Sequence, residues 1–166
     1  MRKKLIAYLF DMSQAVYTKY FKKSEPWGIS KKELLTYPKD SYGYKIGEFL
    51  MQNGFELFPK VERHDAYHVL TGFGTKVEDE IALQCLCLGN GKKSLYMFGA
   101  IFLGVIILPD YLNYYYKAYK MGKSANQFYH FNFKNLLNVN YEDFKALIFT
   151  NEQINQLINT QNPIKL

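Results

Sequence analysis

The sequence predicts an all-α protein, a single-domain bundle of about six to eight helices that spans residues 1–166. Apolar residues recur at helical spacing along most of the chain, and capping residues or glycines interrupt these segments at regular intervals. A chain of 166 residues suits one domain, and an apolar content of 48% is sufficient for a single core.

Four helices are predicted in the first half of the chain. The first covers residues 3–22, where apolar residues recur at helical spacing, and a turn follows over residues 24–30. A short helix to residue 35, a helix to residue 54 and a helix after Pro59 come next. Residues that favour helix ends mark the boundaries: Ser30 with Glu33, Asp40 or Ser41, Gly54, and Gly72 with Gly74.

The second half continues the helical pattern. Thr75, with Glu78 three positions later, predicts the N-cap of a helix that runs to about residue 88. The apolar run over residues 95–108 is too short to span a bilayer and predicts a buried helix. Pro109 kinks or ends it before further helix to residue 122. Residues 123–138 give no clear pattern, and Asn140 predicts the N-cap of a last helix over residues 140–158.

Charge and cysteine content narrow the class of protein. The formal charge is +6, nearly all of it from lysine, and no long basic run or arginine fork indicates nucleic-acid binding. Lysine pairs such as residues 92–93 favour an anionic membrane surface or are ordinary solvated helix ends, and both interpretations stay open. Cys85 and Cys87 point to different faces of a helix and cannot pair, so a reduced, cytoplasmic protein is expected.

Residues 63–80, RHDAYHVLTGFGTKVEDE, gather the residue types that bind metal ions. His64 and His68 are four apart and share one helix face, with Asp65 at its edge, as in zinc enzymes that present two imidazoles to one ion. A tight turn would return Glu80 as a third ligand. Such a set suits Zn²⁺ with an open position, with Fe²⁺ or Mn²⁺ as alternatives. The alternative is a chance histidine pair followed by first-turn acids that complement the helix dipole.

The spacing of these residues resembles the signature of the coenzyme Q biosynthesis protein 4 family, as seen in bacterial-type members. That signature is H-D-x-x-H, then eleven residues, then Glu, with a Thr-Gly pair shortly after the second His. Here it is His64-Asp65-Ala66-Tyr67-His68, then Thr71-Gly72, then Glu80. The family usually has Gly where this chain has Asp79, and often Pro where it has Gly74, but neither departure removes a ligand. The long apolar helix and the N-Y-E-x-F segment at residues 140–144 are also similar.

The resemblance implies a divalent metal, usually zinc, held by His64, Asp65, His68 and Glu80. It also implies an isoprenoid quinone precursor or another prenyl lipid as ligand, and a position on the inner face of a membrane as a peripheral protein. A homodimer or a biosynthetic complex is the expected assembly. The family's link to decarboxylation of the quinone ring makes Asp65 and Glu80 the candidate catalytic acid or base.

A metal beside an apolar pocket would hold the polar head of an amphipathic lipid. The candidate pocket walls are Tyr67, Phe98, Ala100, Phe102, Leu103 and Gly104. Close helix packing at the two small residues is the alternative. Two functions remain open: a metal-dependent enzyme that assists decarboxylation of a prenylated ring precursor, and a non-catalytic prenyl-lipid-binding or scaffold protein in which the metal is structural or anchors a head group.

Overall fold

The computed structural model describes residues 2–6, 8–9 and 25–160 of the chain. Within these residues the only extended pairing is an isolated bridge between Ser41 and Asn140. The all-α prediction is therefore confirmed. Residues 2–6 and 8–9 are helical, but most of the predicted helix over residues 3–22 lies outside the described part of the chain.

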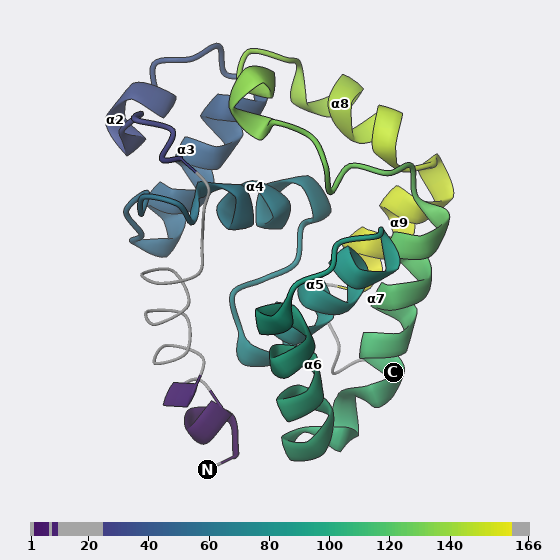
Figure 1. The fold of residues 1–166 in the computed structure, drawn as a ribbon. Coiled ribbons are helices and arrows are strands. Elements are labelled where there is room, and N and C mark those ends of the chain that lie inside the picture. The colour runs from purple at the N-terminus through teal and green to yellow at the C-terminus, as the bar shows by residue number, and fades with distance from the viewer. Residues whose placement is uncertain (1, 7, 10–24, 161–166) are drawn as a thin grey trace.

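The elements follow one another with short connections (Figure 1). In chain order they are α2 (Lys31–Leu34), α3 (Tyr42–Asn53), α4 (Glu62–Thr71), α5 (Val77–Gly89), α6 (Leu95–Ile107), η1 (Pro109–Tyr111), α7 (Leu112–Ser124), η2 (Phe133–Leu136), α8 (Tyr141–Ile148) and α9 (Asn151–Thr160).

Most of the predicted helix caps are present. The side chains of Ser30, Ser41 and Asn140 each accept hydrogen bonds from backbone N–H groups in the first turn of the helix that follows. Gly54 and Gly72 end α3 and α4 with φ values of 67° and 74°, which glycine adopts without strain. Local sequence therefore defines these boundaries.

Two boundaries differ from the prediction. Helix α5 begins after Lys76, which makes no side-chain capping bond, and Thr75 is not its cap. Its first turn carries three acidic residues instead, and their charge stabilises the exposed N–H groups of the helix start. The predicted last helix is broken at Phe149, which is extended, and a reciprocal pair of bonds between Thr150 and Gln153 begins α9.

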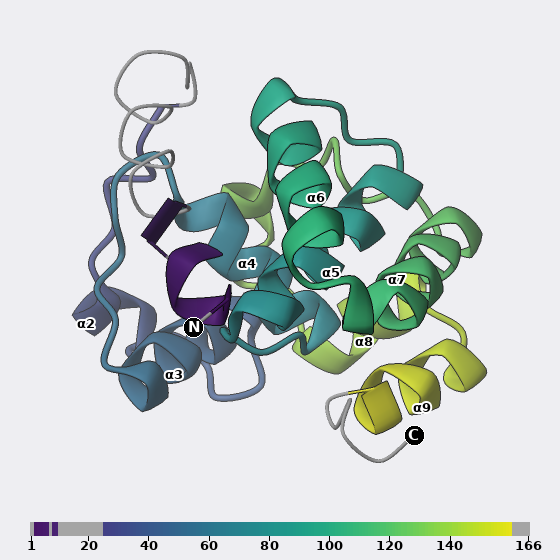
Figure 2. The ribbon, with the colours of Figure 1, turned by 90° about the horizontal axis from the view of Figure 1, so that it is seen from below.

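Helix α5 lies at the centre of the fold and packs against α4, α6 and α7, as Figure 1 and the view from below in Figure 2 show. Glycines allow the closest approach, between α5 and α7: a Cβ on Gly122 would collide with the carbonyl oxygen of Leu86. Helices α2 and α3 pack on each other, and α3 also contacts α4 and α8. The core thus fixes α5 mainly against α7, and the start of α5 lies beside α4.

Helix α6 is not the buried helix that its apolar run predicted. Only Met97, Ala100 and Gly104 are buried, on the side that faces α5, whereas Phe102 is 65% exposed. Pro109 opens the short 3₁₀ segment η1, and the chain bends by 104° between α6 and the helix that follows. Among the described residues no single helix has the length and apolar content to cross a membrane; this bent pair meets both criteria together.

Candidate metal centre

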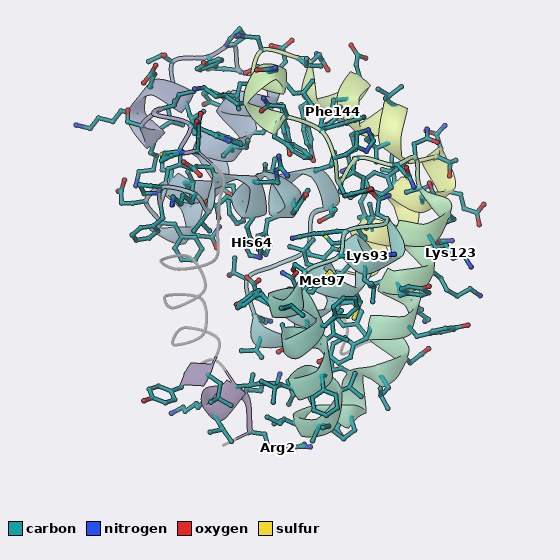
Figure 3. The ribbon with its side chains drawn as sticks, in the orientation of Figure 1. Arg2, His64, Lys93, Met97, Lys123 and Phe144 are labelled. Carbon is teal, nitrogen blue, oxygen red and sulfur yellow. The ribbon has the colours of Figure 1, made fainter. Side chains whose placement is uncertain are left out.

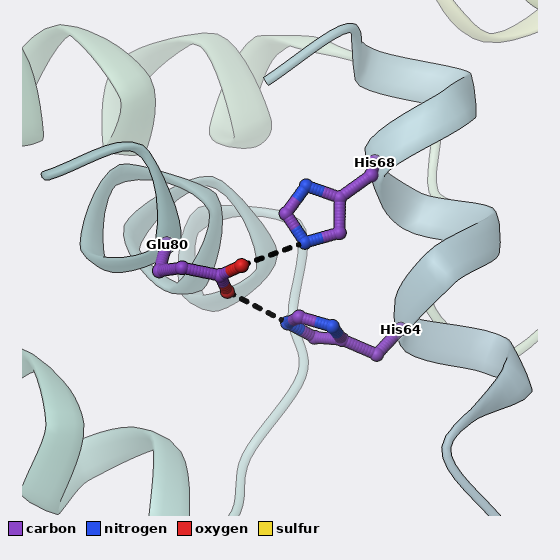
Figure 4. A group of neighbouring side chains, drawn as sticks. All are labelled: His64, His68 and Glu80. Carbon is purple, nitrogen blue, oxygen red and sulfur yellow. Dashed lines mark ion pairs between the residues drawn. The ribbon is translucent and has the colours of Figure 1, made fainter. Parts of the chain in front are cut away.

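Two helices and the turn between them bring together three side chains of types that can bind a metal (Figure 4). Helix α4 presents His64 and His68 on one face, and the first turn of α5 presents Glu80. The left-handed conformation of Gly72 ends α4 and lets the chain turn back within a few residues. The turn therefore places the carboxylate of Glu80 between the two imidazoles.

The distances in this cluster fit a single metal ion. Nε2 of His64 lies 3.1 Å from Oε2 of Glu80, and Nε2 of His68 lies 3.1 Å from Oε1. One ligand atom from each of the three residues lies within 4.8 Å of the others. Donor atoms around a tetrahedral ion with bonds of about 2.1 Å are about 3.4 Å apart, so small shifts would complete the site.

The hydrogen bond of Nδ1 on His68 determines which protonation state of the imidazole faces Glu80. Nδ1 lies 3.0 Å from the carbonyl oxygen of Phe73, which can only accept, so Nδ1 carries a proton. In a neutral imidazole Nε2 would then be a bare acceptor facing the acceptor oxygen of Glu80. Either a second proton or a cation must lie between them. A carbonyl on the outer nitrogen is the usual support of a metal-binding histidine, so the residues present fit a metal ion.

The charges in the cluster oppose the effect of burial. Burial by itself would lower the pKa of His68, but the Glu80 carboxylate and the Phe73 carbonyl outweigh it and raise that pKa. Burial dominates at His64 and lowers its pKa. Burial would raise the pKa of Glu80, yet the two imidazoles hold it well below its usual range. Glu80 is therefore an ionised carboxylate, the form that binds a metal.

The cluster is supported on one side and open on the other. The ring of His68 stacks on Phe49 with centroids 5.5 Å apart, and its side chain is only 2% exposed. The side chains of His64 and Glu80 are 24% and 25% exposed, so solvent reaches the cluster from their side. Three protein ligands with one accessible side are typical of catalytic metal sites.

A family comparison gives these residues a context. The family model for "Coenzyme Q (ubiquinone) biosynthesis protein Coq4" matches residues 59–152, which include α4, α5 and the whole cluster. The chain belongs to this family. Membership of the Coq4 family implies a role in ubiquinone biosynthesis and confirms the resemblance found in the sequence.

Other comparisons bear on the fold of this Coq4 family member. One similar crystal structure is that of a protein from Nostoc punctiforme PCC 73102, which is provisionally named a ubiquinone biosynthesis protein. The alignment covers 91% of this chain and 82% of the Nostoc chain. The TM-score is 0.59 and the sequence identity 16%, so the likeness shows a shared fold. No protein of curated function matches the sequence significantly.

Asp65 stands apart from the three candidate ligands of the motif. Its position next to His64 rotates it by about 100° around the helix, away from the face shared by residues four apart. Asp65 is half-buried, and none of its atoms belongs to the group of ligand atoms that lie within 4.8 Å. Its charge nevertheless reaches His68 and contributes to the raised pKa of that residue. A direct bond from Asp65 to a metal stays a prediction.

Gly74 and Asp79, the two residues that depart from the family pattern, are in contact. A Cβ on Gly74 would lie 2.7 Å from Oδ2 of Asp79, so the absence of a larger residue at position 74 leaves room for the carboxylate. Asp79 is buried, and its Oδ1 accepts a hydrogen bond of 2.8 Å from the hydroxyl of Tyr114 on α7. Asp79 therefore ties α5 to α7 and does not compete with Glu80 for the ligand position.

The six predicted pocket walls divide between different environments. Tyr67 is buried against Phe128 and Phe133, and Gly104 packs on Ile81 of α5. Ala100 is also buried and Leu103 half-buried, whereas Phe98 and Phe102 are 45% and 65% exposed. A lipid pocket with these walls stays a prediction.

The structure has a groove of about 360 Å³ on another side of His68. It is lined by residues from α3, α4, the turn after α4 and the start of α8, among them Lys45, Phe49, Gly72, Tyr141 and Glu142. None of the six predicted wall residues lines this groove.

Two supports of the cluster were not found in the sequence. The Phe73 carbonyl is a backbone group, and no residue type at that position signals it. Phe49 lies fifteen or more residues from the motif on a different helix, so local spacing gives no indication that it stacks on His68. The stacking of Phe49 is a consequence of tertiary packing, whereas the turn after α4 places the Phe73 carbonyl, five residues beyond His68.

Proposed function

We propose that the protein binds a divalent metal ion through His64, His68 and Glu80 and acts on the polar head of a prenylated ring precursor in ubiquinone biosynthesis. The observation that carries the proposal is the convergence of three ligand atoms from α4 and α5 within 4.8 Å. The nitrogen and oxygen donors favour Zn²⁺, with Fe²⁺ or Mn²⁺ as alternatives.

The protein's own residues would orient the ion and leave one side for a ligand. The Phe73 carbonyl and the Phe49 ring fix the imidazole of His68, and Glu80 stays ionised beside it. A bound divalent ion supplies a Lewis acid that polarises a ring oxygen or a carboxylate. The exposed side of His64 and Glu80 is where the head of such a precursor would enter.

Decarboxylation of a ring acid needs a proton donor as well. The bond between the ring carbon and the carboxyl group breaks, carbon dioxide leaves, and the ring carbon keeps the electron pair and takes up a proton. Glu80 does not suit the donor role because its pKa is held well below the usual range. Of the two acids in the motif, Asp65 is therefore the candidate donor, with Glu80 as a ligand.

Turnover of a prenylated 4-hydroxybenzoate by wild type and by His64→Ala tests this enzymatic role. We expect His64→Ala to lose the activity and His130→Ala to keep it, because His130 is exposed and outside the cluster. A folded His64→Ala protein that converts the substrate at the wild-type rate would eliminate the enzyme proposal.

The second candidate function is a non-catalytic lipid-binding or scaffold protein on a membrane surface. The outer face of α6 favours it: Leu95, Phe98, Phe102 and Ile106 recur at helical spacing and are 86%, 45%, 65% and 58% exposed. Lys93 precedes this face. At its other end, the guanidinium of Arg2 lies 3.5 Å from the carbonyl of Ile107 and pairs with Asp110 at 2.6 Å (Figure 3). Exposed apolar residues beside an exposed lysine suit peripheral binding to anionic lipid.

A further inference from the structure

We propose that Tyr114 of α7 is a positioning residue of the candidate metal centre. It contacts the chain on both sides of the turn between α4 and α5, and so it fixes His68 on one side and Glu80 on the other. The inference rests on the proposed function and adds a determinant of metal affinity that lies outside the ligand set. Tyr114 lies 35 residues beyond Asp79, so no local spacing indicates this role.

The first contact fixes the helical turn that carries Glu80. The hydroxyl of Tyr114 donates to Oδ1 of Asp79 at 2.8 Å, and the two residues are 8% and 7% exposed, so water has little access to replace the bond. Asp79 directly precedes Glu80 in the first turn of α5. A rotation of this turn about the helix axis would break the bond and carry the Glu80 carboxylate away from the imidazoles.

The second contact fixes the peptide group that supports His68. The ring of Tyr114 packs against the ring of Phe73, with centroids 5.9 Å apart and planes tilted by 38°. The carbonyl of Phe73 accepts the hydrogen bond of 3.0 Å from Nδ1 of His68. The backbone nitrogen of Phe73 is 3.5 Å from Oγ1 of Thr71, a long distance for a hydrogen bond, so that bond restrains the peptide weakly. Packing on Tyr114 therefore contributes to the position of the carbonyl.

The turn itself encloses the Asp79 carboxylate on its other side. A Cβ on Gly74 would lie 2.7 Å from Oδ2, so the carboxylate lies close against the backbone of the turn. Tyr114 therefore holds the beginning of the turn through Phe73 and the residues beyond its end through Asp79. Groups that orient metal ligands without touching the ion commonly change metal affinity by about 10–100-fold.

The neighbouring Tyr115 provides a matched control within the same helix. Tyr115 is 3% exposed, and its hydroxyl has no hydrogen-bond partner among the described residues. Replacing either tyrosine by Phe removes one buried hydroxyl, but only Tyr114→Phe removes a bond to Asp79. A difference between the two variants therefore reports the bond and not the loss of a hydroxyl from α7.

The affinity for Zn²⁺ tests the inference. It would be measured in wild type, Tyr114→Phe and Tyr115→Phe by competition with a chromophoric chelator, under conditions in which urea denaturation shows each protein to be folded. We expect Tyr114→Phe to bind Zn²⁺ about tenfold more weakly than wild type, and Tyr115→Phe to bind it equally well.

Two further measurements separate positioning from stability. The visible absorption of Co²⁺-loaded protein reports the geometry of the ligands, and it should change in Tyr114→Phe and stay unchanged in Tyr115→Phe. In metal-free protein, NMR should show faster solvent exchange of the His68 Nδ1–H in Tyr114→Phe, because the Phe73 carbonyl that accepts this proton is less firmly held.

The outcomes separate this inference from the proposed function. A Tyr114→Phe protein that is less stable but keeps wild-type Zn²⁺ affinity and His68 proton exchange would overturn the inference, as would an equal loss in Tyr115→Phe. A wild type that takes up no metal would refute the proposed function, while the exchange of the His68 proton in metal-free protein would still decide the role of Tyr114.

Gly74→Ala decides the question if Tyr114→Phe does not fold. Its Cβ displaces the Asp79 carboxylate from the side opposite the Tyr114 hydroxyl, so it should weaken Zn²⁺ binding in the same direction. Wild-type affinity in a folded Gly74→Ala protein would overturn the inference.

Discussion

At the scale of single residues, burial and the charge of Glu80 shift the pKa of His68 in opposite directions. The Glu80 carboxylate raises the pKa of His68 despite burial. Because the folded pKa lies above the unfolded value of about 6.5, the pair stabilises the metal-free fold at low pH. That contribution is lost as the pH rises through the folded pKa.

Glu80→Gln should therefore lower the pKa of His68 in metal-free protein, because burial is then less opposed. NMR titration of the imidazole resonances measures the change. Glu152→Gln, at an exposed position on α9, is the control and should leave the His68 pKa unchanged. The same pKa in Glu80→Gln and wild type would mean that the carboxylate does not face His68.

The side chain of Asn90 makes four hydrogen bonds to backbone groups between residues 122 and 129. Asn90→Ala removes four hydrogen bonds and leaves backbone groups of residues 122, 126, 128 and 129 without them. We expect a loss of about 3 kcal/mol in the free energy of unfolding, measured by urea denaturation. Asn138→Ala, at an exposed position, should change it by less than about 0.5 kcal/mol. Equal effects of the two substitutions would contradict this role.

At the scale of elements, the crossing of α5 and α7 depends on glycine. Gly122→Ala places a Cβ against the backbone of Leu86, which cannot move without separating the helices. We expect a loss of about 3 kcal/mol or more in the free energy of unfolding.

Gly99→Ala provides the matched control for this prediction. Gly99 lies within α6, and a Cβ there would meet no atom within 4 Å. Alanine has the higher helix propensity, so this change should stabilise the protein by about 0.5–1 kcal/mol. Thermal unfolding followed by circular dichroism compares the two. A neutral Gly122→Ala would mean that α5 and α7 are not in close contact.

The elements also show what the sequence can and cannot predict. Ser30, Ser41, Gly54 and Asn140 act within one turn of their helix, so their local signals predicted the boundaries correctly. The break before α9 had a local signal as well, the Thr150–Gln153 pair, but the apolar spacing continued through it. The buried face of α6 is the one with the two small residues, Ala100 and Gly104, so their spacing of four was the local signal for close helix packing. The apolar content of the run did not reveal that its opposite face is exposed.

At the scale of the whole molecule, the candidate metal cluster and the buried hydrogen bonds of Asn90 differ in how they could be predicted. His64, His68 and Glu80 followed from spacing on two consecutive helices and a short turn. Asn90, which fixes the end of α5 to α7 and to residues 128–129, gave no such local signal, because its partners lie 32 to 39 residues further along the chain.

The outer face of α6 predicts membrane binding that depends on its exposed apolar residues. Phe102→Asp should strongly reduce sedimentation with phosphatidylglycerol vesicles, because it places a charge in the centre of the apolar face. Leu147→Asp on α8 is the matched control, since Leu147 is 62% and Phe102 65% exposed, and α8 lies at the other end of the molecule (Figure 1).

Varying the salt concentration and the lipid charge tests whether the binding is electrostatic as well as apolar. Wild-type binding should weaken at high salt and on vesicles of phosphatidylcholine alone, because the lysines are then screened or have no anionic partner. If Phe102→Asp and Leu147→Asp bind the vesicles equally well, the α6 face is not the membrane-binding surface.

The metal content of the protein tests the central claim most directly. The protein would be purified without chelators or added metal, beside the double variant His64→Ala/His68→Ala and the control His130→Ala. We predict about one divalent ion per chain in wild type and His130→Ala, and none in the folded double variant. A wild type that is empty and does not take up Zn²⁺, Fe²⁺ or Mn²⁺ would contradict the account, and so would equal metal in the double variant.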